Sequence, residues 1–320
     1  MKAQTILKRS RTFAASLLPV IVLALSCGGC QPAAAPPAPP PVAAPPAAAP
    51  TASSATVDAP KTADPAANTS TTAEPTTKTA DAKATKLVVA MAADLRFVSV
   101  ELQKEFEQQT PGITIEPIFG ASGKLFAQIE NKAPFDIFLS ADVQFPEKLA
   151  EGGLTKKDSL FRYAIGHIVL WVRNDSPLPI EEKGAEILKD PQLKKVAIAN
   201  PKTAPYGRAA EAALKKLGLY DEIQSKLVLG ENIAQAAQFA ETGAADAAVI
   251  GLSFASAPEF SSKGKYWKFP ADSFPPLVQG GAILEQTQHP EAAKKFCDYL
   301  QSPGAQEIFK KYGFGLPTAP

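Results

Sequence analysis

The segment Lys86–Phe106 constrains the fold more than any other part of the chain, because it joins an apolar strand directly to an amphipathic helix. The apolar run at 87–92 has the length of a strand and is too short for a helix on its own. The next apolar residues recur at helical spacing and share one face: Leu95, Val98, Leu102 and Phe106. A strand that leads straight into a helix is the first half of a βαβ unit, which predicts a parallel sheet in an α/β fold.

The same junction indicates a binding edge. Asp94 lies where the strand becomes the helix, and its side chain is predicted to cap free N–H groups there. The helix start points at the carboxyl edge of the sheet, where open α/β folds hold small ligands and anions. We therefore look for further helix starts that converge on this edge.

Residues 1–26 predict an export signal, and Cys27 a lipid anchor. A basic start is followed by an apolar stretch at 13–25, which is short for a membrane span. The residues before Cys27, Leu23-Ala24-Leu25-Ser26, resemble a lipobox, whose cysteine is acylated and becomes the mature N-terminus. Cys30 is the alternative site of acylation, and a Cys27–Cys30 disulfide or ordinary cleavage remains open.

Residues 27–85 are predicted to be a lipid-anchored, disordered tether. Nearly every residue between Gln31 and Pro60 is Ala or Pro, and Thr, Ala, Lys and Asp recur up to about Thr85. The segment contains no aromatic residue, so no apolar core offsets the entropy of ordering it. A Pro-rich chain of this kind stays extended at roughly 3 Å per residue.

Residues 86–320 form the predicted folded part, long enough for two lobes of ordinary domain size. We expect strands at 87–92, 113–119, 135–140, 161–172, 195–199, 245–251 and 277–284. We expect helices from 95 onward, at 124–131, up to about 151, and at 205–217, 232–241, 290–300 and 304–312. The strand at 161–172 is expected to cross into a second lobe and the strand at 277–284 to return. Lobe 1 is then about 86–164 and 268–320, and lobe 2 about 165–267.

Several function classes lack support in the sequence. The formal net charge is +1 without a basic stripe, so a nucleic-acid partner is not expected. His167 and His289 have no Cys or His at ligand spacing, which argues against a zinc site. No G-x-S-x-G motif is present, which argues against a hydrolase, and Cys297 sits at a packing position of a predicted helix. We expect neither an enzyme nor a bound cofactor or metal cation.

The loop Gly120–Lys124 looks like the end of a P-loop, but Ile118 and Leu125 stand where that motif needs Gly and Ser or Thr. What remains is Ser122 just before a helix, able to offer a hydroxyl and an amide to an anion. Two similar junctions occur at Tyr206 and at Ile233, the latter capped by Asn232. Each is explained as an ordinary helix cap or as packing; together they favour an anion site.

These junctions lie in blocks that resemble the periplasmic molybdate-binding proteins of ABC importers. The resemblance spans about 86–315 and rests on VVAMAADL, on FGASGKLFAQIENKAPFDIFLSAD at 119–142, on YAIGHIVLW, on NPKTAPYGRAAEAALKKLG and on the terminal IFKKYGFGLP. It implies a type II periplasmic-binding fold of two lobes. Each lobe would be a mixed sheet flanked by helices, the lobes being joined by two crossover strands with an oxyanion closed between them.

The resemblance also implies a set of ligand donors: Ala93, Asp94, Ser122, Tyr206 and Ile233. Two positions depart from the family. Asp94 stands where Ser, Thr or Asn is common, and we expect it to donate only its N–H while its side chain caps the helix. Gly251 replaces a tyrosine that binds the ligand in some members, whereas other members carry the tyrosine at the position of Tyr206.

We therefore expect a lipid-anchored, monomeric receptor for molybdate, and tungstate as well, that serves an ABC permease at the cell surface or in the periplasm. Neutral donors at helix starts can hold such a dianion without a buried cation. Closure would be a hinge motion about the crossovers near Ala164 and Lys268. The alternative is a surface protein that uses the same fold for adhesion or oxyanion sensing without transport.

Overall fold

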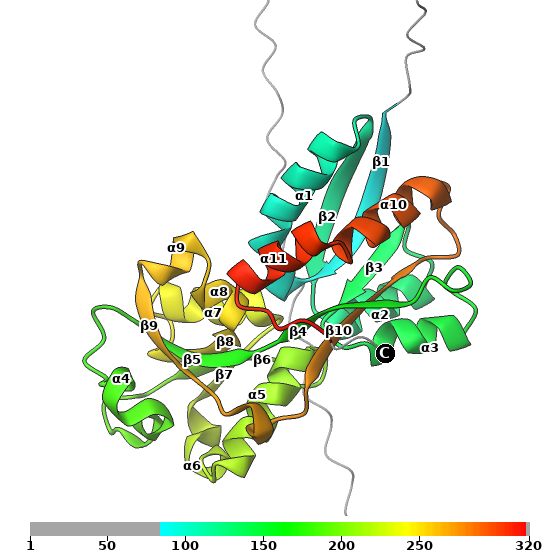
Figure 1. Cartoon of the computed structure of the whole chain (residues 1–320). Coiled ribbons are helices and arrows are strands. Elements are labelled where there is room, and N and C mark those ends of the chain that lie inside the picture. The colour runs from blue at the N-terminus through cyan, green and yellow to red at the C-terminus, as the bar shows by residue number, and fades with distance from the viewer. Residues whose placement is uncertain (1–83, 318–320) are drawn as a thin grey trace, which may run out of the picture. The chain divides into compact units, whose positions relative to one another are not determined.

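The computed structural model describes residues 84–317 (Figure 1). The predictions on the export signal, on Cys27 and Cys30, and on most of the tether therefore concern residues outside this range. Within it, no helix is both long and apolar enough to cross a membrane.

The first sheet contains five strands in the order β2-β1-β3-β10-β4. They are β1 (Thr85–Ala92), β2 (Ile113–Gly120), β3 (Ile137–Ser140), β4 (Phe161–Gly166) and β10 (Leu277–Ile283). Strand β1 runs parallel to β2 and β3, while β10 is antiparallel to both of its neighbours, β3 and β4. The sheet is therefore mixed, with the carboxyl ends of β1, β2 and β3 at one edge.

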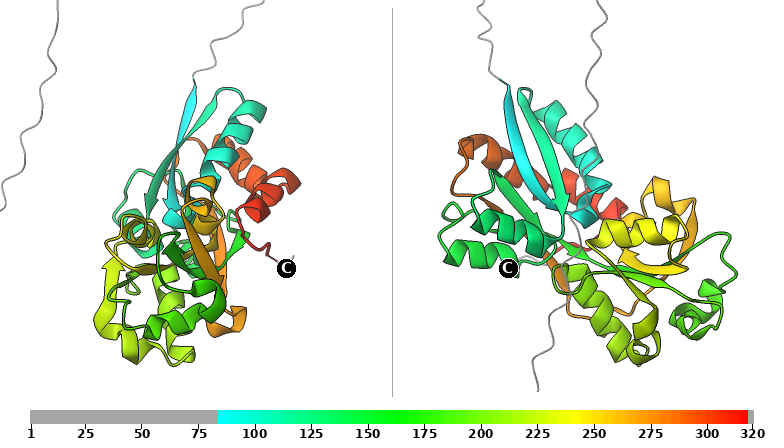
Figure 2. Two further views of the ribbon diagram at one scale, coloured as in Figure 1. Left: turned by 90° about the vertical axis from the view of Figure 1, so that its left-hand side faces the viewer. Right: turned by 180° about the vertical axis from the view of Figure 1, so that it is seen from behind.

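Helices cover both faces of this sheet. Successive side chains of β1 point to opposite faces, and the buried ones on each face are apolar and pack against helices. Leu87, Val89 and Met91 pack with residues of α1 (Val98–Gln109), α10 (Pro290–Leu300) and α11 (Pro303–Lys311). Ala90 packs on the other face, against α2 (Ser122–Glu130) and α3 (Gln144–Glu151). The views in Figure 2 show these two helical layers on either side of the strands.

The second sheet also contains five strands, in the order β7-β6-β8-β5-β9. They are β5 (Ile168–Arg173), β6 (Val196–Ala199), β7 (Leu227–Gly230), β8 (Ala247–Gly251) and β9 (Gly264–Lys268). Its helices are α4 (Ile180–Lys183), α5 (Pro205–Lys216), α6 (Tyr220–Ile223), α7 (Ile233–Glu241), α8 (Leu252–Ala255) and α9 (Pro258–Ser261). Short 3-10 turns complete the chain at η1 (Ala93–Leu95), η2 (Gly184–Lys189), η3 (Gln224–Lys226) and η4 (Ala271–Ser273).

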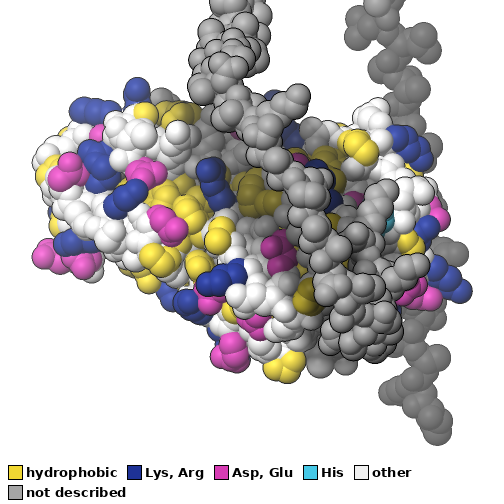
Figure 3. All heavy atoms as spheres, turned by 90° about the horizontal axis from the view of Figure 1, so that it is seen from above, with side chains coloured by type: hydrophobic (Ala, Val, Ile, Leu, Met, Phe, Trp, Pro, Cys, Tyr) yellow, Lys and Arg dark blue, Asp and Glu magenta, His cyan; other side chains and the backbone are white. Residues whose placement is uncertain are grey.

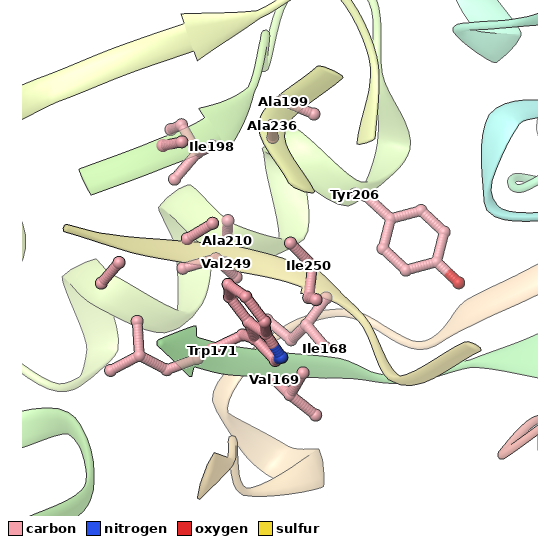
Figure 4. Packing of buried hydrophobic residues seen from close by; sticks show 14 of the residues in the cluster. Ile168, Val169, Trp171, Ile198, Ala199, Tyr206, Ala210, Ala236, Val249 and Ile250 are labelled. Atoms are coloured by element: carbon pink, nitrogen blue, oxygen red, sulfur yellow. The ribbon is translucent and has the colours of Figure 1, made fainter. Parts of the chain in front are cut away.

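The core of the second sheet is built on its buried strands. Trp171 is fully buried on β5 and belongs to the same apolar cluster as Ile168, Val249 and Ile250 of this sheet (Figure 4). Small residues of α5 and α7, such as Ala210 and Ala236, bring the helices close to the strands. Tyr206 stands at the edge of this core, with its hydroxyl directed away from Trp171.

Two connections join the sheets. Strand β4 passes into β5 through His167, and β9 leads through η4 into β10. We call the first sheet with its helices lobe 1 and the second sheet with its helices lobe 2. The fold is thus the predicted α/β arrangement of two mixed sheets flanked by helices and joined by two crossovers.

Some element boundaries differ from the sequence-based expectation. The expected single strand at 161–172 is two strands, because its first half pairs with β10 and its second half with β8 and β9. Helix α1 begins at Val98, after a separate turn at Ala93–Leu95. Strands β7 and β9 were not expected, because both are partly exposed and lack a buried apolar run; β7 leaves Leu229 exposed and β9 leaves Tyr266 exposed.

Candidate oxyanion-binding site

One small cavity between the lobes brings all five predicted donor residues together. It lies where β1, β2 and β3 of lobe 1 end and where α5 and α7 of lobe 2 begin. Its lining residues are Ala92, Ala93, Asp94, Gly120, Ala121, Ser122, Ala141, Ala204, Pro205, Tyr206, Asn232 and Ile233. The cavity volume is about 10 Å³, room for about one water-sized group. A tetrahedral oxyanion carries four oxygen atoms, so the lining residues would have to move apart for it to enter.

Ser122 is the first residue of α2 and is only 1 % exposed. Its Oγ accepts a hydrogen bond from the Ala141 N–H at 3.1 Å. Since that contact uses only a lone pair, the hydroxyl proton stays available as a donor. The Ser122 N–H belongs to the first turn, whose N–H groups have no acceptor within the helix. Both groups can therefore serve an anion at this position.

The start of α7 has the cap predicted for it. Asn232 Oδ1 accepts hydrogen bonds from the N–H groups of Ala234 and Gln235, at 3.0 and 3.1 Å. This leaves the N–H of Ile233, the first helical residue, without an acceptor in the helix. Ile233 is 3 % exposed and lines the cavity, so its amide is a candidate donor to a ligand there.

Tyr206 is held at the cavity by the close approach of α5 to β6. A Cβ atom at Gly207 would overlap the carbonyl oxygen of Ala199, so only glycine allows the helix to start this near the strand end. Tyr206 is buried, and its hydroxyl donates a hydrogen bond to Asp94 Oδ2 at 3.0 Å. Burial and the neighbouring carboxyl raise the pKa of Tyr206, which keeps the phenol neutral and a donor.

The structure also accounts for Gly251. A Cβ atom there would lie 3.2 Å from Cε1 of Tyr206, so a larger side chain would enter the space of the Tyr206 ring. A tyrosine at 251 and a tyrosine at 206 therefore compete for one volume. This competition gives a physical reason for the pattern that the resemblance implies, in which a family member carries the tyrosine at one of the two positions.

The predicted role of the Asp94 side chain as a helix cap is wrong. The turn at Ala93–Leu95 and helix α1 have no side-chain cap. The Asp94 carboxyl instead accepts hydrogen bonds from Tyr206 Oη and from Gln279 Nε2, which come from α5 and β10. Asp94 is 1 % exposed where the two lobes meet, so that Tyr206 contacts it from lobe 2 and Gln279 from lobe 1.

Sequence reasoning missed Gln279, which is fully buried on β10 and holds Asp94. The available signal was a lone polar residue in the apolar strand pattern at 277–283, since a buried polar side chain needs a partner. Ala141, at the end of β3, was also missed, and only its N–H contacts a predicted donor residue.

Three further contacts between the lobes, besides that of Tyr206 with Asp94, lie beside the cavity. The Gly123 N–H donates to the Thr203 carbonyl oxygen at 2.9 Å, which links α2 to the segment before α5. Lys124 pairs with Glu231, and Arg208 pairs with Asp142, each at 2.6 Å. These contacts are possible only with the lobes close together, so the structure represents a closed form.

A larger groove, of about 470 Å³, opens beside the cavity. It shares Ala93 and Asn232 with the cavity, and its other lining residues are aromatic rings, charged side chains of both signs, two glutamines and Ala234. Hydrophobic and charged side chains are similarly mixed on the uncovered part of the face in Figure 3. Of the helix starts of α2, α5 and α7, the groove includes only that of α7, so the small cavity is the candidate site despite its size.

Comparisons with known proteins show the family to which this chain belongs. The sequence pattern of the family described as "Bacterial extracellular solute-binding protein" matches residues 87–315. The molybdate-binding protein ModA of Azotobacter vinelandii is 41 % identical over 235 residues, which are 73 % of this chain and 92 % of that protein. The chain belongs to the ModA family of bacterial extracellular solute-binding proteins.

A second relative and a solved structure are also similar to this chain. A putative ABC transporter substrate-binding lipoprotein of Bacillus subtilis, YvgL, is 34 % identical, with 72 % of this chain and 87 % of YvgL covered. The solved structure of the periplasmic molybdate-binding protein of Azotobacter vinelandii superposes with a TM-score of 0.67 at 33 % identity, covering 72 % of this chain and all of that one. The two-lobed fold is thus that of this family.

Proposed function

We propose that the protein captures molybdate, and tungstate as well, outside the cytoplasm and delivers it to an ABC importer. The observation that carries the proposal is the convergence of Ser122, Tyr206 and Ile233 on one cavity, each at a helix start. Helix N-termini present N–H groups and a partial positive charge, which suit a tetrahedral dianion. The kinship with molybdate-binding proteins supports the same ligand.

The donors are proposed to be the amides of Ala93, Asp94, Ser122 and Ile233 with the Ser122 hydroxyl, and the Tyr206 hydroxyl once it is free of Asp94. No reaction and no resident cofactor or cation is part of the proposal, because ligand capture needs only hydrogen bonds. The alternative role in adhesion or sensing without transport is not favoured, since the similar Bacillus protein YvgL is named as a putative substrate-binding lipoprotein of an ABC transporter.

Calorimetric titration with molybdate, tungstate, sulfate and phosphate tests the proposal. We expect tight binding of molybdate and tungstate and much weaker binding of the other two. All four are oxyanions of similar shape, so the same donors can bind each of them. The order of their affinities must therefore depend on the radius of the cavity. Absence of molybdate binding, or stronger binding of sulfate or phosphate, would refute the assignment.

The delivery step implies a membrane permease as partner, with the receptor a monomer tethered to the membrane by a lipid on Cys27. The lipoprotein description of the similar Bacillus protein supports this anchor. Metabolic labelling with palmitate should mark the wild type but not Cys27→Ser. Label that persists in Cys27→Ser and disappears in Cys30→Ser would move the anchor to Cys30.

A further inference from the structure

An ionisable carboxyl lies in the wall of the anion cavity. Asp94 lines the cavity and is 1 % exposed. Its Oδ2 accepts hydrogen bonds from Tyr206 and Gln279, whereas its Oδ1 is buried without a partner among the described residues. Ser253 Oγ donates to the Asp94 carbonyl oxygen at 2.9 Å, which fixes the backbone of the turn. The carboxyl therefore cannot turn away from the site without breaking these contacts.

The groups that face Asp94 from the surrounding elements are all uncharged. Helix α5 presents Tyr206, β10 presents Gln279 and α8 presents Ser253. Burial, and after it the nearby charge of ionised Asp94, raises the pKa of Tyr163 on β4, so this phenol is neutral as well. The remaining elements packed on this turn, β2 and α7, line the cavity with Gly120 and Ile233.

The cation nearest in sequence does not compensate the carboxylate. Arg96 is exposed and lines the larger groove outside the cavity. Burial without a cation raises the pKa of Asp94 to about 6, against the opposing effect of its hydrogen bonds from Gln279 and Tyr206. A dianion placed in the same cavity adds like charge and favours the neutral carboxyl further.

We propose that the Asp94 carboxyl makes oxyanion capture proton-linked: it takes up one proton from solvent when a dianion enters the cavity. This inference rests on the proposed function and adds a pH dependence to the same site. The neutral carboxyl offers an O–H donor where the carboxylate offers only acceptors, and it holds the Tyr206 hydroxyl less firmly. The only covalent change is the formation of one O–H bond with a proton from water.

Binding should therefore weaken as pH rises. Above the pKa of about 6 the unliganded carboxyl is ionised, so binding must take up a proton from solvent. The concentration of free protons falls tenfold with each pH unit. The affinity for molybdate should then fall about tenfold per pH unit, until the pKa of the liganded state is reached. Below that range the affinity should become independent of pH.

Calorimetric titration with molybdate measures the proton directly. At about pH 7.5, titrations in two buffers of different ionisation enthalpy should report uptake of about one proton per anion by the wild type. Asp94→Asn cannot ionise and should show uptake near zero, with an affinity that no longer depends on pH. Asp136→Asn is the matched control, because Asp136 is the other carboxyl less than a tenth exposed among the described residues and lies at the opposite end of β3.

A second variant keeps the test decisive if Asp94→Asn does not fold. Gln279→Leu retains the carboxyl but removes a donor that stabilises its ionised form, so the pH at which affinity begins to fall should move upward. Wild-type binding without proton uptake would overturn the inference and leave the proposed function standing. Uptake that persists in Asp94→Asn would also overturn it. Absence of any molybdate binding would overturn both.

Discussion

At the residue scale, anion binding depends on whether the Ser122 hydroxyl proton is free to donate a hydrogen bond to the ligand. The Ser122 Oγ is bonded as an acceptor to Ala141 N–H, so the contact that orients the side chain does not consume its proton. Asp94 behaves in the opposite way, because it takes hydrogen bonds from the Tyr206 and Gln279 side chains and offers none while ionised. One wall of the cavity therefore attracts an anion, and the other repels it until it is protonated.

Ser122→Ala should weaken molybdate binding by about tenfold to a hundredfold, because it removes a hydrogen bond to a charged ligand worth about 1.5–3 kcal/mol. It also leaves the Ala141 N–H buried without its acceptor, at a cost of about 1–3 kcal/mol in the free energy of unfolding. Titration calorimetry and thermal melting without ligand measure the two effects separately.

Ser159→Ala is the matched control. Its Oγ accepts a backbone N–H, from Ile283, at 3.2 Å, but Ser159 does not line the cavity. The control should lose stability and keep its affinity. If Ser122→Ala behaved in the same way, the hydroxyl would have only a structural role.

At the element scale, the starts of α2, α5 and α7 meet across the gap between the lobes. Helices α5 and α7 belong to lobe 2, and α2 faces them from lobe 1, linked by the Gly123 N–H to the Thr203 carbonyl oxygen. The ion pairs Lys124–Glu231 and Arg208–Asp142 add little each, since exposed pairs contribute about 0–1 kcal/mol. The close backbone contact at Gly123 is therefore the more sensitive test of closure.

Gly123→Ala should impair closure. A Cβ atom at this position would lie 2.7 Å from the Thr203 carbonyl oxygen, so the lobes would have to stay further apart. Overpacking of this kind costs about 1–3 kcal/mol, which corresponds to about five- to hundredfold in affinity. Titration calorimetry with molybdate measures the loss, and faster ligand dissociation in stopped-flow experiments should accompany it.

Gly152→Ala serves as its control, because the nearest atom to a Cβ there, the Lys148 carbonyl oxygen, lies at an ordinary 3.4 Å. Its affinity should match that of the wild type. Equal affinities for Gly123→Ala and the wild type would mean that binding does not need the lobes to approach this closely.

At the scale of the whole molecule, the described residues that line the cavity all lie between Ala92 and Ile233. A chain that begins at Ala84 should therefore fold and bind molybdate with unchanged affinity. Titration of this shortened chain beside the full one makes the comparison. A large loss of affinity would show that residues before Ala84 contribute to binding.

The sequence by itself determined the features that depend on neighbours along the chain. The βα alternation, the Asn232 cap and the junctions at Ser122, Tyr206 and Ile233 follow from local periodicity and helix-start chemistry, which are readable in short windows. The mixed sheets joined by two crossovers were expected from the resemblance to a known family and not from local periodicity. The break of 161–172 at His167 was not, because it depends on which distant strands each half pairs with.

Only the tertiary structure decided the environment of Asp94. Its partners Tyr206 and Gln279 are 112 and 185 residues away along the chain, on elements of different lobes. A cap needs only its own helix, so local reasoning assigned the carboxyl to one. Gln279 lies on β10 in the same lobe as Asp94, whereas Tyr206 reaches Asp94 only because lobe 2 closes over it. The buried carboxyl takes the donors that this packing brings to it.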